Sequence, residues 1–191
     1  TAGAAVLIQG ASSAVGLMAM KIAKLWGAGL VIGSSTTAEK RKKLRQYGAD
    51  LAIDSSDPNW VQDVLNVTEQ QGVDLIIDQI SGAVARSNLK ATKIQGTIVN
   101  VGRLGGGLEQ FDFDLHALRR INYVGVTFRT RSMEEIGTIV QNMQANLWSN
   151  VIKGDLDLPI DQVFSLQDVK KAVDHMKDNK HMGKIIMKAV D

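Results

Sequence analysis

The alternation of short apolar runs with amphipathic segments is the feature that most restricts the fold. The first run, Val6–Gln9, stops at Gly10, as expected of a strand that is buried on both faces of a parallel sheet. Residues 15–26 carry apolar side chains at three- and four-residue spacing, which predicts an amphipathic helix. Residues 30–32 then predict a second buried strand. The chain therefore begins as a strand–helix–strand unit.

The same alternation continues along most of the chain. Further strands are predicted at residues 51–53, 73–78, 97–101 and 123–128, and further helices at residues 38–47, 60–67, 84–92 and 133–147. Strands that alternate with helices of this length predict an α/β fold with a doubly wound parallel sheet, covered on both faces and built from right-handed crossovers. Residues 151–191 break this pattern and predict a C-terminal strand–helix–strand appendage.

Charge and composition exclude several functional classes. Lys and Arg total 22 against 20 Asp and Glu, so the net charge of +2 gives no electrostatic reason to expect nucleic acid or an anionic membrane as a partner. No apolar run approaches the roughly 20 residues of a membrane span, and the N-terminus lacks a signal-peptide pattern. The chain has no Cys, which excludes disulfide frameworks and thiol nucleophiles and suits a reducing compartment. We therefore expect a cytoplasmic protein.

A loop of small residues joins the first strand to the first helix. It reads Gly10-Ala11-Ser12-Ser13-Ala14-Val15-Gly16. A dinucleotide site needs small residues here, because the strand must turn sharply, the backbone must approach the pyrophosphate, and the helix must pack close to the sheet. Ser13 and Ala14 stand where glycines are commonest. The alternative is a plain strand-to-helix connection, but the position after the first strand favours a dinucleotide site.

The end of the second predicted strand indicates which dinucleotide is bound. An acidic residue there would bond the adenosine ribose and favour NAD, but residues 33–37 contain no carboxylate. The hydroxyls of Ser34 and Ser35 and the ammonium of Lys40 predict a site for a 2′-phosphate, and hence NADP(H). For Lys40, the solvated face of a surface helix is an equally good interpretation.

The histidines do not predict a metal site. His116, His175 and His181 share no ligand-like spacing, so we expect surface or packing roles for them. No catalytic side chain can be assigned from the sequence.

Several segments, taken in order, resemble the nucleotide-binding domain of the medium-chain dehydrogenase/reductase superfamily, which includes zinc-type alcohol dehydrogenases. The resemblance is best to its quinone oxidoreductase and enoyl reductase branch and runs along nearly the whole chain. It is carried by Val6–Ala11 into Val15-Gly16, Glu39–Arg41, Tyr47–Asp50, Gly72–Asp78, Gly96–Val99, Val101-Gly102 and Gly183–Met187. The short-chain family shares the glycine loop, but its Tyr-x-x-x-Lys pair is absent. The residue four positions after Tyr47 is Leu51, and the residue four positions after Tyr123 is Thr127.

This resemblance implies a Rossmann-type dinucleotide-binding domain over residues 1–150. It places Gly10, Ser12, Ser13, Ala14, Val15 and Gly16 around the pyrophosphate, and Ser34, Ser35 and Lys40 around the 2′-phosphate. It places Val101, Gly102, Thr127 and Phe128 near the nicotinamide. A tyrosine often follows the third strand in these reductases, but Ser55 stands at about that position here.

The resemblance implies an NADPH-dependent oxidoreductase that transfers hydride to a small-molecule acceptor: a quinone, an enone or an enoyl thioester. It also implies that residues 151–191 fold with an N-terminal GroES-like substrate lobe, which we do not find in this sequence, so we expect a piece of a longer protein. Three alternatives stay open: an NADP(H)-binding module that is inactive without its partner lobe, part of a zinc alcohol dehydrogenase, and part of a synthase enoyl reductase. A homodimer through the edge strand near Phe128 is a further expectation.

Overall fold

The computed structural model describes residues 2–189 and contains a six-stranded sheet and a two-stranded sheet. Thr1 and residues 190–191, the outer ends of the two predicted units, lie outside the described residues. The strands of the large sheet are β1 (Ala5–Gln9), β2 (Leu30–Ser34), β3 (Leu51–Ile53), β4 (Val73–Asp78), β5 (Thr92–Asn100) and β6 (Asn122–Gly125). All neighbours pair in parallel in the order β3-β2-β1-β4-β5-β6, so the predicted doubly wound fold is confirmed.

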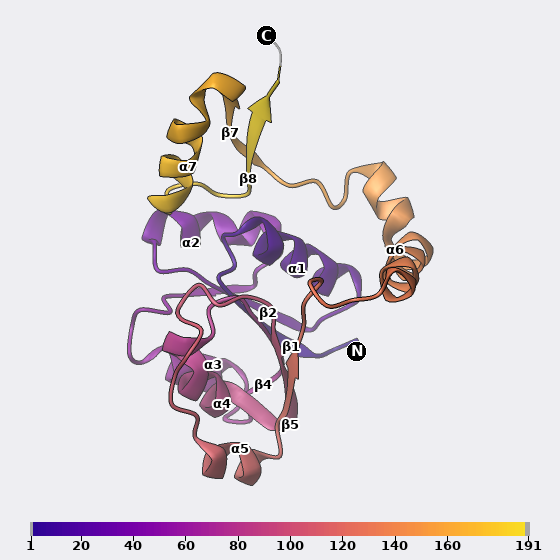
Figure 1. Ribbon diagram of the computed structural model, residues 1–191. Helices are drawn as coiled ribbons and strands as arrows, with labels where there is room; N and C mark the ends of the chain where they lie inside the picture. The colour runs from indigo at the N-terminus through magenta and orange to yellow at the C-terminus, as the bar shows by residue number, and fades with distance from the viewer. Residues whose placement is uncertain (1, 190–191) are drawn as a thin grey trace.

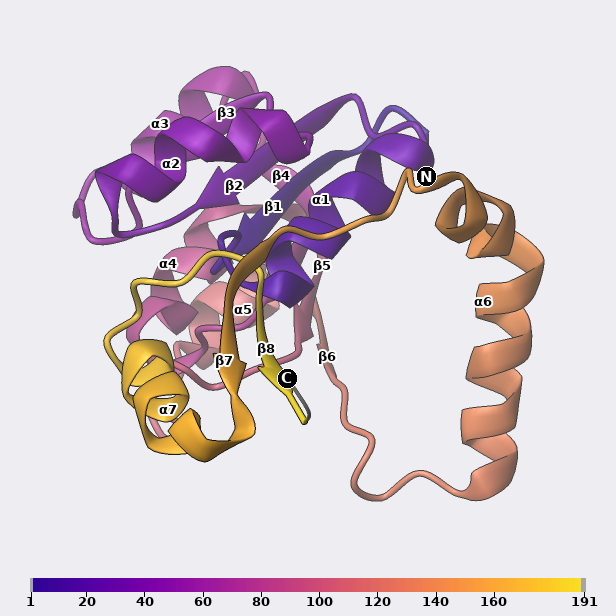
Figure 2. The same cartoon turned by 90° about the horizontal axis from the view of Figure 1, so that it is seen from above.

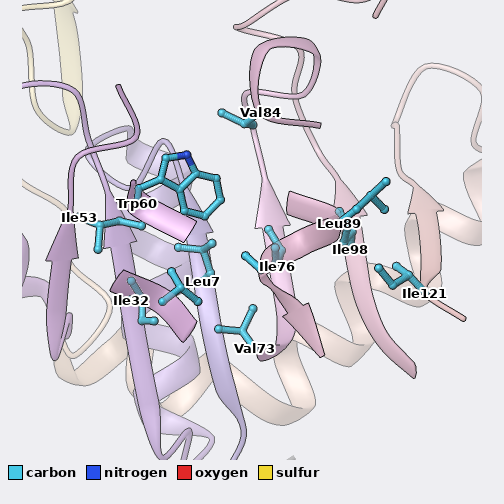
Figure 3. Close-up of a cluster of buried hydrophobic side chains, with 12 residues drawn as sticks. Leu7, Ile32, Ile53, Trp60, Val73, Ile76, Val84, Leu89, Ile98 and Ile121 are labelled. Carbon is cyan, nitrogen blue, oxygen red and sulfur yellow. The ribbon is translucent and has the colours of Figure 1, made fainter. Parts of the chain in front are cut away.

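Helices pack on both faces of this sheet (Figure 1). One face carries α1 (Ala14–Leu25) and α2 (Ala38–Leu44), and the other carries α3 (Trp60–Val67), α4 (Ala85–Ala91) and α5 (Phe113–Arg119). Successive strand residues feed opposite cores, since Val6 and Ile8 pack toward α1 whereas Leu7 packs toward α3 and α4. The second of these cores, which contains Trp60, Ile76 and Ile98, is drawn in Figure 3.

Residues 160–188 form the predicted strand–helix–strand appendage, whereas residues 151–153 belong to the end of the preceding helix. The appendage consists of β7 (Ile160–Ser165), α7 (Val169–Lys177) and β8 (Lys184–Lys188), with β7 and β8 paired in parallel. This unit meets α2 where the Lys40 ammonium donates to the Asn179 carbonyl, and it meets the start of α1 through the Ser13–Gly183 bridge. Figures 1 and 2 show it at the edge of the main domain. Met182, just before β8, is 8% exposed and packs into the core beneath α1. The appendage is therefore attached to the main domain near the end of the first strand.

One helix and two strand boundaries differ from the sequence prediction. The short helix α5 was not expected; Asp112 caps it by accepting a hydrogen bond from the Leu115 N–H at 2.9 Å. The strand predicted over residues 123–128 ends at Gly125, because the chain leaves the sheet after Val126 bonds to the Asn100 carbonyl at 3.1 Å. Strand β5 begins at Thr92 rather than at Thr97, through a register shift against β4.

Helix α6 (Met133–Lys153) is longer than predicted and has no buried residue. A capping box between Ser132 and Glu135 begins it, and Gly154, with φ at 79°, ends it. Figures 1 and 2 both show α6 standing apart from the sheet. The sheet face beside α1 accordingly keeps an apolar hollow of about 510 Å³, lined in part by Ile22, Trp26 and Ile77. Among residues 2–189, no helix combines the length and the apolar character that crossing a membrane requires.

A buried chain of hydrogen bonds links the carboxyl ends of β2, β1 and β4. The Ser34 hydroxyl donates to Gln9 Oε1 at 2.6 Å, Gln9 Nε2 donates to Asn88 Oδ1 at 2.8 Å, and Asn88 Nδ2 donates to Asp78 Oδ2 at 2.9 Å. All four side chains are fully buried. Because each amide donates at one end and accepts at the other, the Asp78 carboxylate sets the direction of the whole chain.

The Asp78 carboxylate is also the acceptor for the turn that follows β4. Its Oδ1 atom accepts the backbone N–H groups of Ile80 and Ser81 at 2.8 and 2.9 Å. Burial raises the pKa of Asp78, and these hydrogen bonds oppose that rise. The turn after β4 is therefore tied to the same buried group as the strand ends.

Replacing Ile76 by Ala tests the core. Ile76 is fully buried at the centre of β4, so the Ile76→Ala variant should lose about 2–5 kcal/mol of unfolding free energy. The matched control is Ile94→Ala, at a side chain that is 53% exposed on β5, which should lose less than about 1 kcal/mol. Urea unfolding followed by circular dichroism measures both. Equal losses would contradict the assignment of Ile76 to the core.

Replacing Asp78 by Asn tests the direction of the buried hydrogen bonds. The new amide keeps an acceptor for the Ile80 and Ser81 N–H groups, but it turns a second NH₂ group toward Asn88 Nδ2. Two donors then face each other, and we expect a loss of about 1–3 kcal/mol in unfolding free energy. Asp174→Asn, at an exposed side chain on α7, is the control and should change stability by at most about 0.5 kcal/mol. An Asp78→Asn variant as stable as the wild type would show that the network is not directional.

Candidate functional site

The loop between β1 and α1 has the shape that a bound phosphate group requires. Gly10 has φ at 71°, in the left-handed region that favours glycine. A Cβ atom at Gly16 would lie 2.6 Å from Ala11 Cα and from the Gly10 carbonyl oxygen, so only glycine fits where α1 crosses the strand end. The two outer glycines of the sequence motif therefore have the two roles expected of them, a sharp turn and a close approach of helix to strand.

The first turn of α1 has backbone donors that no residue of the helix itself accepts. Ser13 is its N-cap residue and accepts the Gly16 N–H at 3.0 Å, whereas the N–H groups of Ala14 and Val15 have no partner within the helix. The first turn contains no acidic residue, so no carboxylate competes for these groups or for the positive end of the helix dipole.

Gln79 fixes the loop to the end of β4, a role that the sequence analysis missed. The Ser13 hydroxyl donates to Gln79 Oε1 at 2.8 Å, and Gln79 Nε2 donates to the Gly10 carbonyl at 3.3 Å. Its sequence signal is a polar residue directly after the buried run of β4. The glycine loop is thus held in place from the neighbouring strand.

A cleft of about 600 Å³ opens beside this loop, at the carboxyl ends of β1 and its neighbours. Strands β1 and β4 are adjacent although their chain connections leave in opposite directions, and doubly wound proteins bind ligands at such a point. The cleft is lined by Gly10, Ser12, Ser13, Ser35, Thr36, Ser55, Ile80, Leu104, Gly105, Met176, Lys177, Asn179 and His181. The structure therefore brings together the predicted residues Gly10, Ser12, Ser13 and Ser35.

Ser34 and Lys40 lie close to the cleft but their polar atoms already have partners. Ser34 is fully buried; its hydroxyl accepts the Gly10 N–H at 3.1 Å in addition to its bond to Gln9. Lys40 is only 6% exposed, and its ammonium donates to the backbone carbonyl of Asn179 at 2.5 Å and to its Oδ1 at 3.1 Å. Burial lowers the pKa of Lys40, and the charge of Asp161 opposes that shift. Lys40 is not on the solvated face of α2.

The remaining predicted residues lie at the borders of the site. Val101 and Gly102 both donate their N–H groups to the Asp78 carbonyl, at 2.7 and 3.1 Å, and therefore lie against the end of β4. Thr127 and Phe128 follow the end of β6, and Phe128 is 64% exposed. These four residues are outside the lining of the cleft, as are Ala14 and Val15, which border a shallow depression beside Leu158 and Lys184.

The far wall of the cleft comes from the C-terminal appendage, which the sequence analysis did not place there. Met176, Lys177, Asn179 and His181 contribute to it. No local pattern in the sequence could have indicated this, because the contact joins segments that are more than 160 residues apart. The nearest signal is Gly183, which pairs with Ser13 in an isolated parallel bridge.

The described residues do not fit a zinc site. Within residues 2–189, no three His, Asp or Glu side chains gather where they could hold a metal ion, and the sequence has no Cys. No step of chemistry is therefore assigned to a metal in this chain.

Comparison with known proteins agrees with this geometry. The sequence profile of the zinc-binding dehydrogenase family matches residues 14–145. The quinone oxidoreductase of Pseudomonas aeruginosa is 25% identical over 189 residues, which cover 97% of this chain and 56% of that protein. The highly reducing polyketide synthase azaB of Aspergillus niger is 26% identical over 194 residues, which cover 97% of this chain and 7% of the synthase.

A crystal structure shares the fold. The Escherichia coli quinone oxidoreductase complexed with NADPH superposes with a TM-score of 0.85 at 19% identity, covering 99% of this chain and 58% of that one. The chain thus spans little more than half the length of the quinone oxidoreductases it matches. The expected resemblance to the nucleotide-binding half of the medium-chain dehydrogenases is confirmed, and the chain belongs to the zinc-binding dehydrogenase family.

Proposed function

We propose that this chain binds NADP(H) in the cleft beside the glycine loop and forms the nucleotide-binding half of an NADPH-dependent oxidoreductase. The observation that carries the proposal is the loop itself: Gly10 in the left-handed region, Gly16 with no room for a Cβ atom, and an α1 N-terminus free of acidic residues. The membership of the family and the quinone oxidoreductase relative support it.

Each part of the chain has a distinct role in this proposal. The cleft reaches the N-terminus of α1 at Ser13, which caps the helix. The N–H groups of Ala14 and Val15, just beyond the cleft lining, and the dipole of α1 bind the pyrophosphate there. Ser12 and Ser35, whose hydroxyls are 3.5 Å apart, face the adenosine ribose, with Lys40 beside them. Ser34 supports the loop from inside the sheet. Val101, Gly102, Thr127 and Phe128 border the nicotinamide end.

The absence of a carboxylate at the end of β2 supports NADP(H) over NAD(H). Residues Gly33–Thr37 carry hydroxyls instead, and the nearest carboxylate along α2, Glu39, pairs with Lys42 at 2.8 Å. A 2′-phosphate would meet hydroxyl donors and the cations of α2 rather than a like charge.

When bound, the nicotinamide supplies the hydride for reduction of the acceptor. We propose that the acceptor is a quinone or an activated carbon–carbon double bond, as in an enone or an enoyl thioester. The chain contributes by orienting the ring against the acceptor and excluding water, without a side-chain nucleophile. We also propose a cytoplasmic location, with no nucleic acid or membrane as partner.

The polyketide synthase relative keeps an enoyl reductase role open, and an NADP(H)-binding module without turnover, or part of a zinc alcohol dehydrogenase, stays an alternative. The full-length protein separates them. NADPH oxidation that depends on a quinone or enone favours the reductase, whereas activity on an alcohol that chelators abolish favours the zinc enzyme. Binding without turnover of any acceptor favours the module.

Calorimetric titration of the chain with NADPH and NADH tests the cofactor site. We expect tighter binding of NADPH, and a Lys40→Met variant should weaken NADPH binding about tenfold, or about 1.4 kcal/mol, while leaving NADH binding unchanged. Lys42→Met is the matched control, since Lys42 is exposed and pairs only with Glu39. Thermal unfolding checks that the Lys40 variant keeps its fold. If neither nucleotide binds, the proposed function is wrong; if both bind equally, the assignment of NADP(H) is wrong.

We further propose a homodimer through the outer edge of β6, which pairs only with β5 within the described part of the chain. Sedimentation equilibrium should then report twice the mass of one chain. A Gly125→Pro substitution, at a position whose N–H points away from β5 and which has room for a side chain, should return the monomer. A monomeric wild type would contradict this arrangement.

A further inference from the structure

The segment between α7 and β8 meets the glycine loop at Gly183, and two further contacts hold it against the start of β7. Gly183 pairs with Ser13, and the Met182 N–H donates to Asp161 Oδ1 at 2.9 Å. Gly183 has φ at 91°, and a Cβ atom on it would lie 2.3 Å from the Pro159 carbonyl oxygen. The position of the neighbouring His181 over the cleft is therefore determined by the fold rather than by a freely moving loop.

His181 brings an unsatisfied polar group to this place. Its ring lines the same cleft as Ser12 and Ser35, and its Nδ1 atom is buried without a hydrogen-bond partner within the described part of the chain. Because Nδ1 is buried, the ring meets the cleft through its other edge, which carries Nε2, and this nitrogen is the one that a ligand in the cleft can contact. An anion in the cleft would accept a hydrogen bond from the protonated ring.

The charges around His181 come from three elements. Lys40 lies on α2, Asp161 on β7, and His175 and Lys177 on α7; the Nε2 atom of His175 lies 2.7 Å from Asp161 Oδ2, so this carboxylate is already partnered. Burial lowers the pKa of His181, Lys40 and His175 lower it further, and Asp161 opposes them. Burial and the neighbouring cations thus both favour the neutral imidazole. A bound anion would reverse this balance.

Arg41 brings a second positive charge, besides that of Lys40, to the backbone at Ser35. Arg41 donates to the Ser35 carbonyl at 2.8 Å and pairs with Asp54 at 2.9 Å. The end of β2 is where a doubly wound protein contacts the adenosine ribose. Of the phosphates in NADP(H), the 2′-phosphate is therefore the one nearest to this group of residues.

We propose that His181 binds the 2′-phosphate of NADP(H), takes up a proton as it does so, and makes the preference for NADP(H) dependent on pH. This inference rests on the proposed function and adds a specificity-determining residue to it. No covalent bond changes; one proton moves from solvent to the imidazole, and the phosphate gains a charged donor.

The sign of the pH dependence follows from linkage. The phosphate raises the pKa of His181 in the complex above its value in the free protein, so binding takes up protons between these two values. The contribution of His181 to NADPH affinity therefore falls as the pH rises through this range, by at most about tenfold for each pH unit, because the ring takes up a single proton. The 2′-phosphate also titrates, with a second pKa of about 6, and the difference between the wild type and His181→Gln separates its effect from that of the ring. NADH has the pyrophosphate but lacks the 2′-phosphate, so its affinity should not follow this change.

The test is a titration with NADPH and with NADH between pH 6 and pH 8.5, on the wild type, on His181→Gln and on His116→Gln. His116, on α5 beside Phe111, is the matched control. We expect the NADPH affinity of the wild type and of His116→Gln to fall with rising pH. In His181→Gln this fall should be reduced, NADPH binding at pH 6 should be weakened about tenfold, and NADH binding should be unchanged.

Proton NMR of the wild-type histidines, with and without adenosine 2′-monophosphate, gives a second measurement that needs the His181→Gln variant only to assign the resonance. A raised pKa for His181, assigned by its loss in His181→Gln, supports the proposal. NADPH binding that leaves the pKa of His181 and its variant's affinity unchanged would overturn the role of His181 while the proposed function stands. Failure of the wild type to bind NADPH at all would overturn both.

Discussion

The buried chain of hydrogen bonds that ends on Asp78 is the interaction on which the rest of the site depends. It runs through Ser34, Gln9 and Asn88 and joins the carboxyl ends of three strands in a fixed direction. The same carboxylate accepts the N–H groups of the turn after β4, and the neighbouring Gln79 then holds the glycine loop. The buried polar side chains at the strand ends therefore satisfy one another's hydrogen bonds, and they fix the strand ends beneath the cleft relative to one another.

How much of this could be predicted depends on whether the signal was local. The strands over Val73–Asp78 and Leu51–Ile53 and the helix beginning at Trp60 were located closely, because apolar spacing and glycine stops act over a few residues. The early end of β6 was missed, since the sequence 126–128 is as apolar as a strand. What ends β6 is the length of its neighbour β5 and not its own composition.

The residues of the candidate site also differ in whether a local sequence signal indicated them. Gly10, Ser12, Ser13 and Ser35 were predicted and meet in one cleft, because the loop after the first strand has a fixed geometry in this architecture. The side chain of Ser34 faces the sheet interior, as the alternation of side chains along a strand requires once its neighbour Ser35 faces the cleft. Asn179 and His181 could not be predicted, because they reach the cleft only when the segment before β8 meets the loop after β1.

Helix α6 has a consequence for how the molecule unfolds. With no buried side chain, it takes its stability from its own backbone hydrogen bonds, the Ser132–Glu135 capping box and the stop at Gly154. A helix of 21 residues in that position is a separate cooperative unit, able to melt and reform while the sheet stays intact. Its amide protons should therefore exchange with solvent by local opening, and faster than those of β1 and β4. The free energy of opening α6 is then smaller than the free energy of unfolding the sheet.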